Sequence, residues 1–133
     1  MARRHHKPVL RRVLLADAVV SGGAGLLMVG GTSFLTPVLA VPESLLRVAG
    51  LVLLPYAAGV AYLATRPQLQ RIAVWVVITS NALWALDSIV LLLTGWVAPT
   101  AFGAAVVLTQ ALVVASFAAL QYQGLRQGAP QVS

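Results

Sequence analysis

The sequence contains no cysteine among its 133 residues. This absence excludes disulfides, thiolate zinc sites, iron–sulfur ligation and cysteine nucleophiles. Histidine is almost absent too: His5 and His6 are the only two, and both precede the first apolar run. No phosphate-binding loop, catalytic triad or metalloprotease motif is present in the chain. We therefore expect no metal site and favour a non-enzymatic protein, and the sequence indicates no particular cofactor.

Charged residues are also scarce. They make up 9% of the chain, against roughly a quarter in soluble domains, while 59% of the residues are hydrophobic. Only three residues are acidic, Asp17, Glu43 and Asp87. This composition excludes a soluble fold and predicts an integral membrane protein. The net charge of +6 is concentrated in the first dozen residues, so we expect membrane lipid, and no nucleic acid, as its partner.

Four apolar runs occupy most of the chain, and short linkers with proline or glycine separate them. A helix needs about 20 apolar residues to cross a bilayer, so each run is long enough for one crossing. Short linkers place consecutive helices side by side and antiparallel. The sequence predicts an all-α protein, a four-helix membrane bundle made of two antiparallel hairpins. The predicted helices are 13–35, 42–64, 72–93 and 101–122, within a domain of 13–122 that lies between tails 1–12 and 123–133.

The basic residues predict the orientation. They cluster before the first helix, flank the second linker as Arg66 and Arg71, and recur at Arg126, whereas Arg47 alone falls on the other side. Because short basic segments stay in the cytoplasm, both termini are predicted to be cytoplasmic. Arginine strongly outnumbers lysine, as in GC-rich bacteria, so we expect a bacterial inner membrane. The residues assigned to topology and lipid headgroups are Arg3, Arg4, Lys7, Arg11 and Arg12.

Every predicted helix carries a polar or helix-weakening residue near its middle. Lipid cannot satisfy such groups, so we expect them to face one another inside the bundle. One interpretation is a small ligand site at the bilayer midplane, and the alternative is a set of ordinary interhelical hydrogen bonds. The candidate cluster consists of Ser21, Tyr56, Asn81, Trp84 and Gln110.

Two carboxylates lie inside predicted helices. Asp87 falls in the outer half of the third helix, where an ionised carboxylate is costly, so it is a candidate proton or cation site. An ion pair with Arg47 is the structural alternative, although Arg47 can also pair with Glu43 four residues earlier. Asp17 falls close to the predicted inner boundary. We expect it to be structural, with nearby arginines neutralising it.

Small residues recur at intervals of four in two helices. Gly25 continues a stripe that begins at Asp17 and Ser21, and Ala111, Ala115 and Ala119 form a stripe in the last helix. Such patterns allow helix backbones to approach closely. We therefore predict helix-packing sites there, either within the bundle or against another protein.

Three functions remain open on these grounds. The first is an accessory or interaction subunit that packs beside a larger membrane complex, or beside another copy of the chain. The second is a small proton- or cation-coupled transporter that uses Asp87. The third is a binder of a lipid, quinone or pigment at the bilayer midplane. We favour the accessory subunit, because the chain lacks catalytic motifs and has minimal loops.

Overall fold

The computed structural model describes residues 6–95 and 97–127, and these residues form five α-helices. Side chains are described from Val9 to Arg126, apart from residue 96. Four of the helices are long and apolar enough to cross a bilayer, which confirms the expectation of an all-α chain with four such helices. The helices are α1 (His6–Gly30), α2 (Thr32–Leu39), α3 (Glu43–Thr65), α4 (Arg71–Thr94) and α5 (Ala101–Gln127).

The short helix α2 was not predicted, because residues 13–35 were expected to form one helix. Instead, α1 ends at Gly30 and a new helix starts two residues later. The Thr32 hydroxyl lies 2.5 Å from the carbonyl oxygen of Met28 and 3.0 Å from that of Val29. It thus donates to carbonyl groups at the end of α1, where the regular hydrogen bonds of the helix backbone are interrupted.

The outer bounds of the chain's helical part also differ from the prediction. Helix α1 begins at His6, within the predicted tail, and α5 continues to Gln127, well past residue 122. The two extensions pack against each other: Leu10 and Leu125 are both buried, and a Cβ atom at Gly124 would lie 3.2 Å from the Cβ atom of Leu10. This apolar contact keeps both helices regular beyond the predicted limits.

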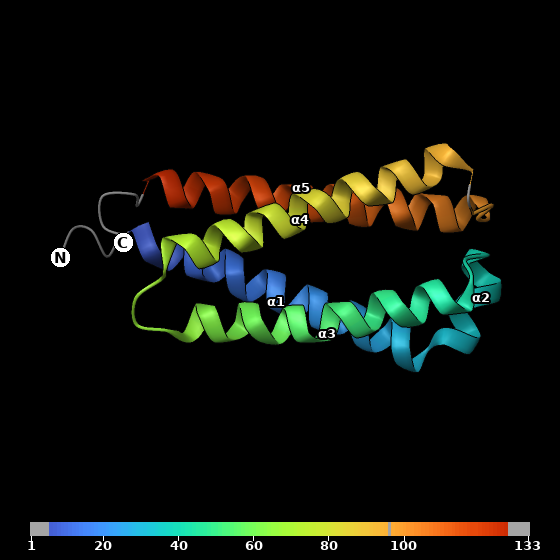
Figure 1. Ribbon diagram of the computed structural model, residues 1–133, viewed down its shortest axis with the longest axis horizontal. Helices are drawn as coiled ribbons and strands as arrows, with labels where there is room; N and C mark the ends of the chain where they lie inside the picture. Colours follow the sequence, from blue (N-terminus) through green and yellow to red (C-terminus); the bar gives the residue numbers. More distant parts are fainter. Residues whose placement is uncertain (1–5, 96, 128–133) are drawn as a thin grey trace.

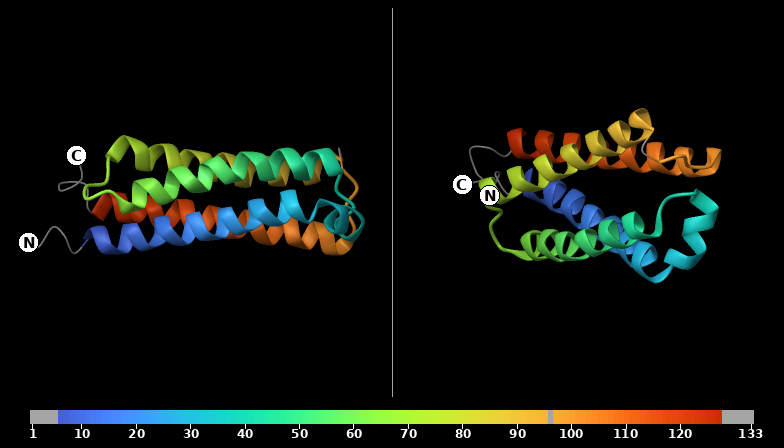
Figure 2. Two further views of the ribbon diagram at one scale, coloured as in Figure 1. Left: turned by 90° about the horizontal axis from the view of Figure 1, so that it is seen from below. Right: turned by 45° about the vertical axis from the view of Figure 1, so that its right-hand side comes forward.

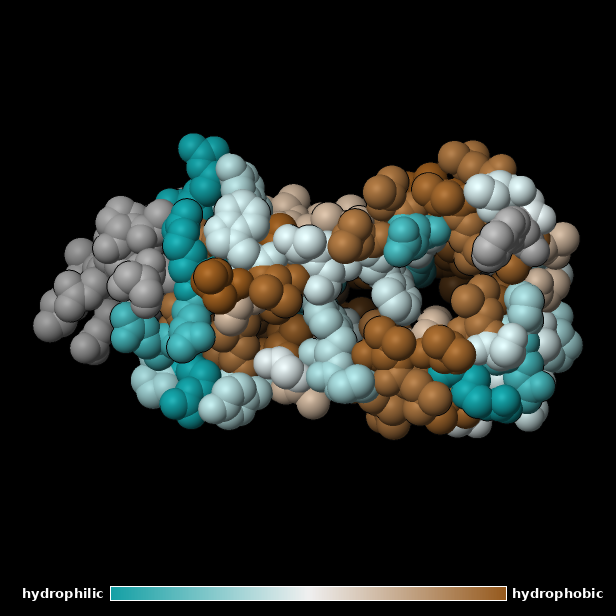
Figure 3. All heavy atoms as spheres, in the orientation of Figure 1, coloured by the Kyte–Doolittle hydropathy of each residue, from teal (hydrophilic) through white to brown (hydrophobic). Residues whose placement is uncertain are grey.

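The long helices form two layers (Figure 1). Helices α1 and α3 pack along each other in one layer, and α4 and α5 do so in the other. Helix α1 also packs against α5, whereas α3 and α4 make little contact. The two layers diverge toward the end of the molecule that carries α2, as the right-hand view of Figure 2 shows. Figure 3 shows a hollow between the layers in the same half.

The start of α1, the end of α5 and the link between α3 and α4 all lie at one end of the molecule (Figure 1). We call it the arginine end, and Figure 3 shows a hydrophilic band across it. The arginines that lie there are Arg11, Arg12, Arg66, Arg71 and Arg126. Of the other residues assigned to headgroup contact, Arg3 and Arg4 lie outside the described residues, as does the side chain of Lys7.

Arg11 binds the end of α3. Its guanidinium donates to the carbonyl oxygens of Ala64, Arg66 (2.6 Å) and Pro67 (3.4 Å). The last carbonyl groups of a helix lack intrahelical donors and carry a partial negative charge. Arg11 therefore stabilises the C-terminal end of α3 and joins it to α1.

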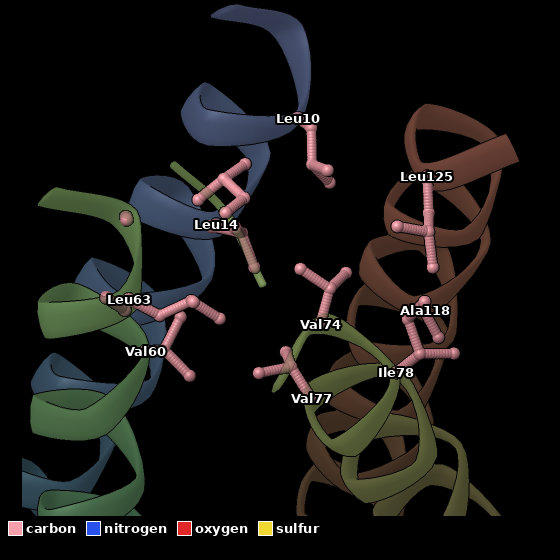
Figure 4. Close-up of a cluster of buried hydrophobic side chains, with 12 residues drawn as sticks. Leu10, Leu14, Val60, Leu63, Val74, Val77, Ile78, Ala118 and Leu125 are labelled. Carbon is pink, nitrogen blue, oxygen red and sulfur yellow. The ribbon is translucent and has the colours of Figure 1, made fainter. Parts of the chain in front are cut away.

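An apolar cluster fills the space between the helices near the arginine end (Figure 4). Its side chains come from all four long helices and from the link before α4, and they point toward one another. The buried members are Leu10, Leu14, Ala18, Val60, Leu63, Ala64, Leu69, Val74, Val77, Ile78, Ala118 and Leu125. We call this cluster the apolar plug, because it closes the centre of the molecule at that end.

Further from the arginine end, α1 and α3 cross at two glycines. A Cβ atom added at Gly50 would lie 2.9 Å from the carbonyl oxygen of Gly25 and 2.8 Å from Cγ2 of Val29. The backbones are therefore too close for any side chain at Gly50. Gly25 takes part in helix packing within the chain. In the second predicted stripe, Ala111 is buried, whereas Ala115 and Ala119 are exposed on the outer face of α5.

Candidate functional site

A buried carboxylate lies where the four long helices meet. The side chain of Asp17 on α1 is 1% exposed and accepts hydrogen bonds from four side chains. Its Oδ1 atom accepts from the Ser21 hydroxyl at 3.0 Å. Its Oδ2 atom accepts from Tyr56 Oη at 2.9 Å, Asn81 Nδ2 at 2.8 Å and Gln121 Nε2 at 2.8 Å. Each long helix thus contributes a donor, and we call these five residues the Asp17 network.

The donors also bond one another. Asn81 Nδ2 donates to Gln121 Oε1 at 3.0 Å, and Tyr56 Oη lies 2.9 Å from Asn81 Oδ1. Asn81 and Gln121 are both fully enclosed by protein, with exposed fractions of 3% and 0%. Buried polar groups are expensive unless they are paired, and pairing across helices fixes how the helices pack. The network therefore ties all four long helices together at one level.

The expected neutralisation of Asp17 by arginine does not occur within the described part of the chain. The Arg11 guanidinium is engaged at the end of α3, and that of Arg66 lies over the Tyr62 ring, 5.2 Å from its centroid. The only ion pair found between described residues joins Arg47 to Glu43, at 2.6 Å. The partners of Asp17 are instead neutral groups.

Asp17 is enclosed although it lies near the arginine end. It comes five residues after the exposed Arg12, about 7.5 Å along a helix axis, and the other long helices cover it. The sequence did not predict its partners on those three helices.

The number of hydrogen atoms available for the hydrogen bonds of the network shows that it can bind a proton. Tyr56 Oη carries one hydrogen but lies 2.9 Å from two oxygens, Asp17 Oδ2 and Asn81 Oδ1. If Asp17 is ionised, both oxygens are acceptors, and one contact has no hydrogen between its atoms. A proton on Oδ2 of Asp17 completes the set: the carboxyl donates to Tyr56, and Tyr56 donates to Asn81. The network has room for one more proton than its ionised form holds.

A metal ion fits this geometry poorly. Three donors already surround Oδ2, two of them amide nitrogen atoms, which do not ligate hard cations. Within residues 6–95 and 97–127 there is no group of three or more histidine, cysteine or acidic side chains that could hold a metal. The chemistry of the site is therefore that of proton binding.

A second polar network follows on the side away from the arginine end. Trp84 Nε1 donates to Gln110 Oε1 at 2.8 Å, and Gln110 Nε2 donates to the Ser88 hydroxyl at 2.8 Å. Trp84 comes three residues after Asn81 on α4, about 4.5 Å further along the helix. The predicted midplane cluster is thus divided. Ser21, Tyr56 and Asn81 surround Asp17, whereas Trp84 and Gln110 pair with each other.

Asp87 lies apart from both networks. It is exposed on α4, seven residues before the end of that helix at Thr94. No hydrogen bond or ion pair between described side chains involves it. Arg47, its candidate partner, donates to Glu43 Oε2 on the same helix. The i,i+4 spacing on one helix brings these two side chains together without any tertiary movement, which favours this pair.

A groove connects the Asp17 network with the arginine end. It has a volume of about 910 Å³ and runs between α3 and α4, which make little contact with each other. Arg66, Gln68 and Gln70 line it at the arginine end, and Pro55 and Tyr56 line it at its deepest level. Tyr56 therefore belongs both to the groove and to the network around Asp17.

The sequence did not predict Gln121 as a site residue, and it predicted only a structural role for Asp17. Gln121 lies one residue before the predicted end of the last helix, where a polar side chain was expected to face the membrane surface; α5 instead continues to Gln127. One signal could have revealed it: Ala111, Ala118 and Leu125 are spaced by seven and all are buried, and Gln121 follows Ala118 by three on the same face.

Comparisons with known proteins add no relatives: no family model, curated protein or solved structure matches this chain.

Proposed function

We propose that this chain is a small integral membrane protein of a bacterial inner membrane that provides a pathway for protons, with Asp17 as the proton-binding group. The four apolar helices form a bundle across the bilayer, and the arginine end faces the cytoplasm because short basic segments are retained there. Both termini are then cytoplasmic. The observation that carries the proposal is a buried carboxylate bound by donors from four helices, with one hydrogen too few when it is ionised.

Polar groups on both sides of Asp17 support a route for protons through the bundle. On the cytoplasmic side, the groove between α3 and α4 reaches Tyr56, while the apolar plug blocks the centre of the bundle. On the other side, the second network continues the line of polar groups along α4 through Trp84 and Ser88. Carboxylates within membrane helices are rare because lipid tolerates them poorly, and proton relays are among the sites where they occur. In this proposal, Asp17 is the proton-binding residue, a role that the sequence suggested for Asp87.

Proton flux into proteoliposomes tests this function. Vesicles loaded with potassium and a pH-sensitive dye are treated with valinomycin, so that a negative interior draws protons inward. The wild-type protein should acidify the interior faster than protein-free vesicles. Asp17→Asn should remove the difference, since an amide retains the size of the side chain but binds no proton. Asp87→Asn is the matched control and should conduct like the wild type. Equal flux in wild-type and protein-free vesicles, or undiminished flux in Asp17→Asn, would refute the proposal.

A second candidate function, an interaction subunit, is supported by Asp87. Its carboxylate is exposed in an apolar setting, with Leu83, Leu86 and Val90 also exposed on α4. A basic or hydrogen-bonding side chain from a neighbouring protein would satisfy it. Purification from native membranes in nanodiscs supports this function if a stoichiometric partner or second copy is recovered with the wild type and lost with Asp87→Leu. Recovery of a monomer from wild-type membranes would contradict it.

A further inference from the structure

The groove between α3 and α4 goes beyond the proton site, because its shape and charge indicate a ligand of its own. Its mouth lies at the arginine end and its walls are mostly apolar, with Gly59, Val76 and Ile72 among them. The volume of about 910 Å³ lies at the upper end of the range of ligand pockets, roughly 300–1,000 Å³. An elongated groove of this size, with Gly59, Ile72 and Val76 exposed along it, fits a long apolar molecule.

The length of the groove matches one leaflet of a bilayer. On α3 its lining extends from Arg66 to Pro55, eleven residues, which is about 16 Å along a helix axis. Half of the ~30 Å hydrocarbon core is about 15 Å. A lipid acyl chain that enters at the cytoplasmic surface would therefore end beside Tyr56, near the middle of the bilayer.

The mouth selects an anionic headgroup. Arg66 is exposed there, and its guanidinium lies 5.2 Å from the centroid of the Tyr62 ring, which also lines the groove. Gln68 and Gln70 add hydrogen-bonding groups to the same rim. None of the three acidic residues of the chain lines the groove. The rim is thus positively charged and has donors suited to a phosphate.

We propose that the α3–α4 groove binds one anionic phospholipid of the cytoplasmic leaflet, with its phosphate at Arg66 and one acyl chain along Gly59. A free phosphate compound would use the rim but leave the apolar length of the groove empty. The match to leaflet depth therefore favours the lipid over a soluble anion. The groove is also the cytoplasmic part of the proposed proton route, so a bound acyl chain would occupy that part of the route. The lipid proposal rests on the rim and the walls of the groove and not on Asp17, and lipid retention by Asp17→Asn distinguishes the two proposals.

Two glycines provide a matched pair of variants. Gly59 lines the groove and Gly23 is exposed on α1, and an added Cβ atom meets nothing within 4 Å at either position. Gly59→Leu fills the groove, whereas Gly23→Leu adds the same side chain elsewhere. Arg66→Gln removes the charge at the mouth, and Arg12→Gln removes an exposed arginine that does not line the groove.

The experiment measures lipid retention by native mass spectrometry. Purified protein is incubated in detergent with equal amounts of phosphatidylglycerol and phosphatidylcholine. We expect one phosphatidylglycerol molecule on the wild type, Gly23→Leu, Arg12→Gln and Asp17→Asn, and none on Gly59→Leu. Arg66→Gln should lower the preference for phosphatidylglycerol about fivefold, because one basic residue near an anionic surface contributes about 1 kcal/mol.

Three results would overturn the proposal. The first is equal retention of the two lipids by the wild type. The second is unchanged retention by Gly59→Leu together with an unchanged preference in Arg66→Gln. The third is displacement of the lipid by glycerol 3-phosphate at equal concentration, which would show that the site binds the free phosphate compound. Should Gly59→Leu fail to fold by circular dichroism, Arg66→Gln alone decides the outcome.

Discussion

Replacing Asp17 by leucine removes the shared acceptor of the network while keeping a side chain of similar size. Four side chains, one from each long helix, lose their hydrogen bond to the carboxyl group. Hydrogen bonds between membrane helices contribute about 0.6 kcal/mol each on average, so four bonds place the loss at about 2 to 3 kcal/mol in the free energy of unfolding. The enclosed amides of Asn81 and Gln121 have no water to replace that acceptor, which favours the upper part of this range.

The assay is unfolding in mixed micelles with increasing dodecyl sulfate, followed by circular dichroism. Asp17→Asn should lose less than Asp17→Leu, because the amide oxygen can accept from the donors around Oδ2 while its nitrogen donates to Ser21. Asp87→Leu serves as the control: this side chain is exposed and makes no bond within the described chain, so a change of less than about 0.5 kcal/mol is expected. If Asp17→Leu were as stable as the wild type, the network would not be the link between the helices.

Other variants test other parts of the structure. Gly50→Ala should destabilise the protein by about 1 to 3 kcal/mol in the same assay, because its Cβ atom would overlap the backbone of α1, whereas Gly23→Ala should not. Arg11→Gln should cost about 1 to 2 kcal/mol by releasing the last carbonyl groups of α3, and increased amide hydrogen exchange confined to that end would show it. Gln110→Leu should cost about 0.6 to 1.7 kcal/mol and change the fluorescence of Trp84, whose indole loses its acceptor; an unchanged emission spectrum would contradict the second network.

The four long helices were predictable because the bilayer sets their length and apolar character. The contacts that their polar residues make between helices were harder to predict. Counting depth from Arg12 placed Asp17 at the surface, since a basic pair usually marks the interface. The structure shows that Asp17 is 1% exposed and bound by side chains from all four long helices, although it lies only five residues from Arg12. Hydropathy gives the position of a carboxylate along a helix, but not the face of the bundle that it takes.

The sequence also did not predict that the polar residues divide into two networks. Tyr56, Asn81 and Trp84 all fall near the middle of their helices, so depth alone predicted a single cluster. Rotation about the helix axes separates them. Asn81 faces the centre of the molecule, whereas Trp84 turns toward Gln110 on α5. The face that each residue takes depends on which helices pack together, and the sequence of one chain does not specify that pairing.

The central claim is that Asp17 holds a proton within its network, and infrared spectroscopy tests it most directly. The chain has only three acidic side chains, so the carbonyl stretch of a protonated carboxyl is readily assigned by mutation. For the wild type in bilayers we predict one such band. The band should be absent from Asp17→Asn, retained in Asp87→Asn and shifted in Tyr56→Phe, which loses the hydroxyl that contacts Asp17. A wild-type spectrum without this band, or a band that persists in Asp17→Asn, would contradict the account.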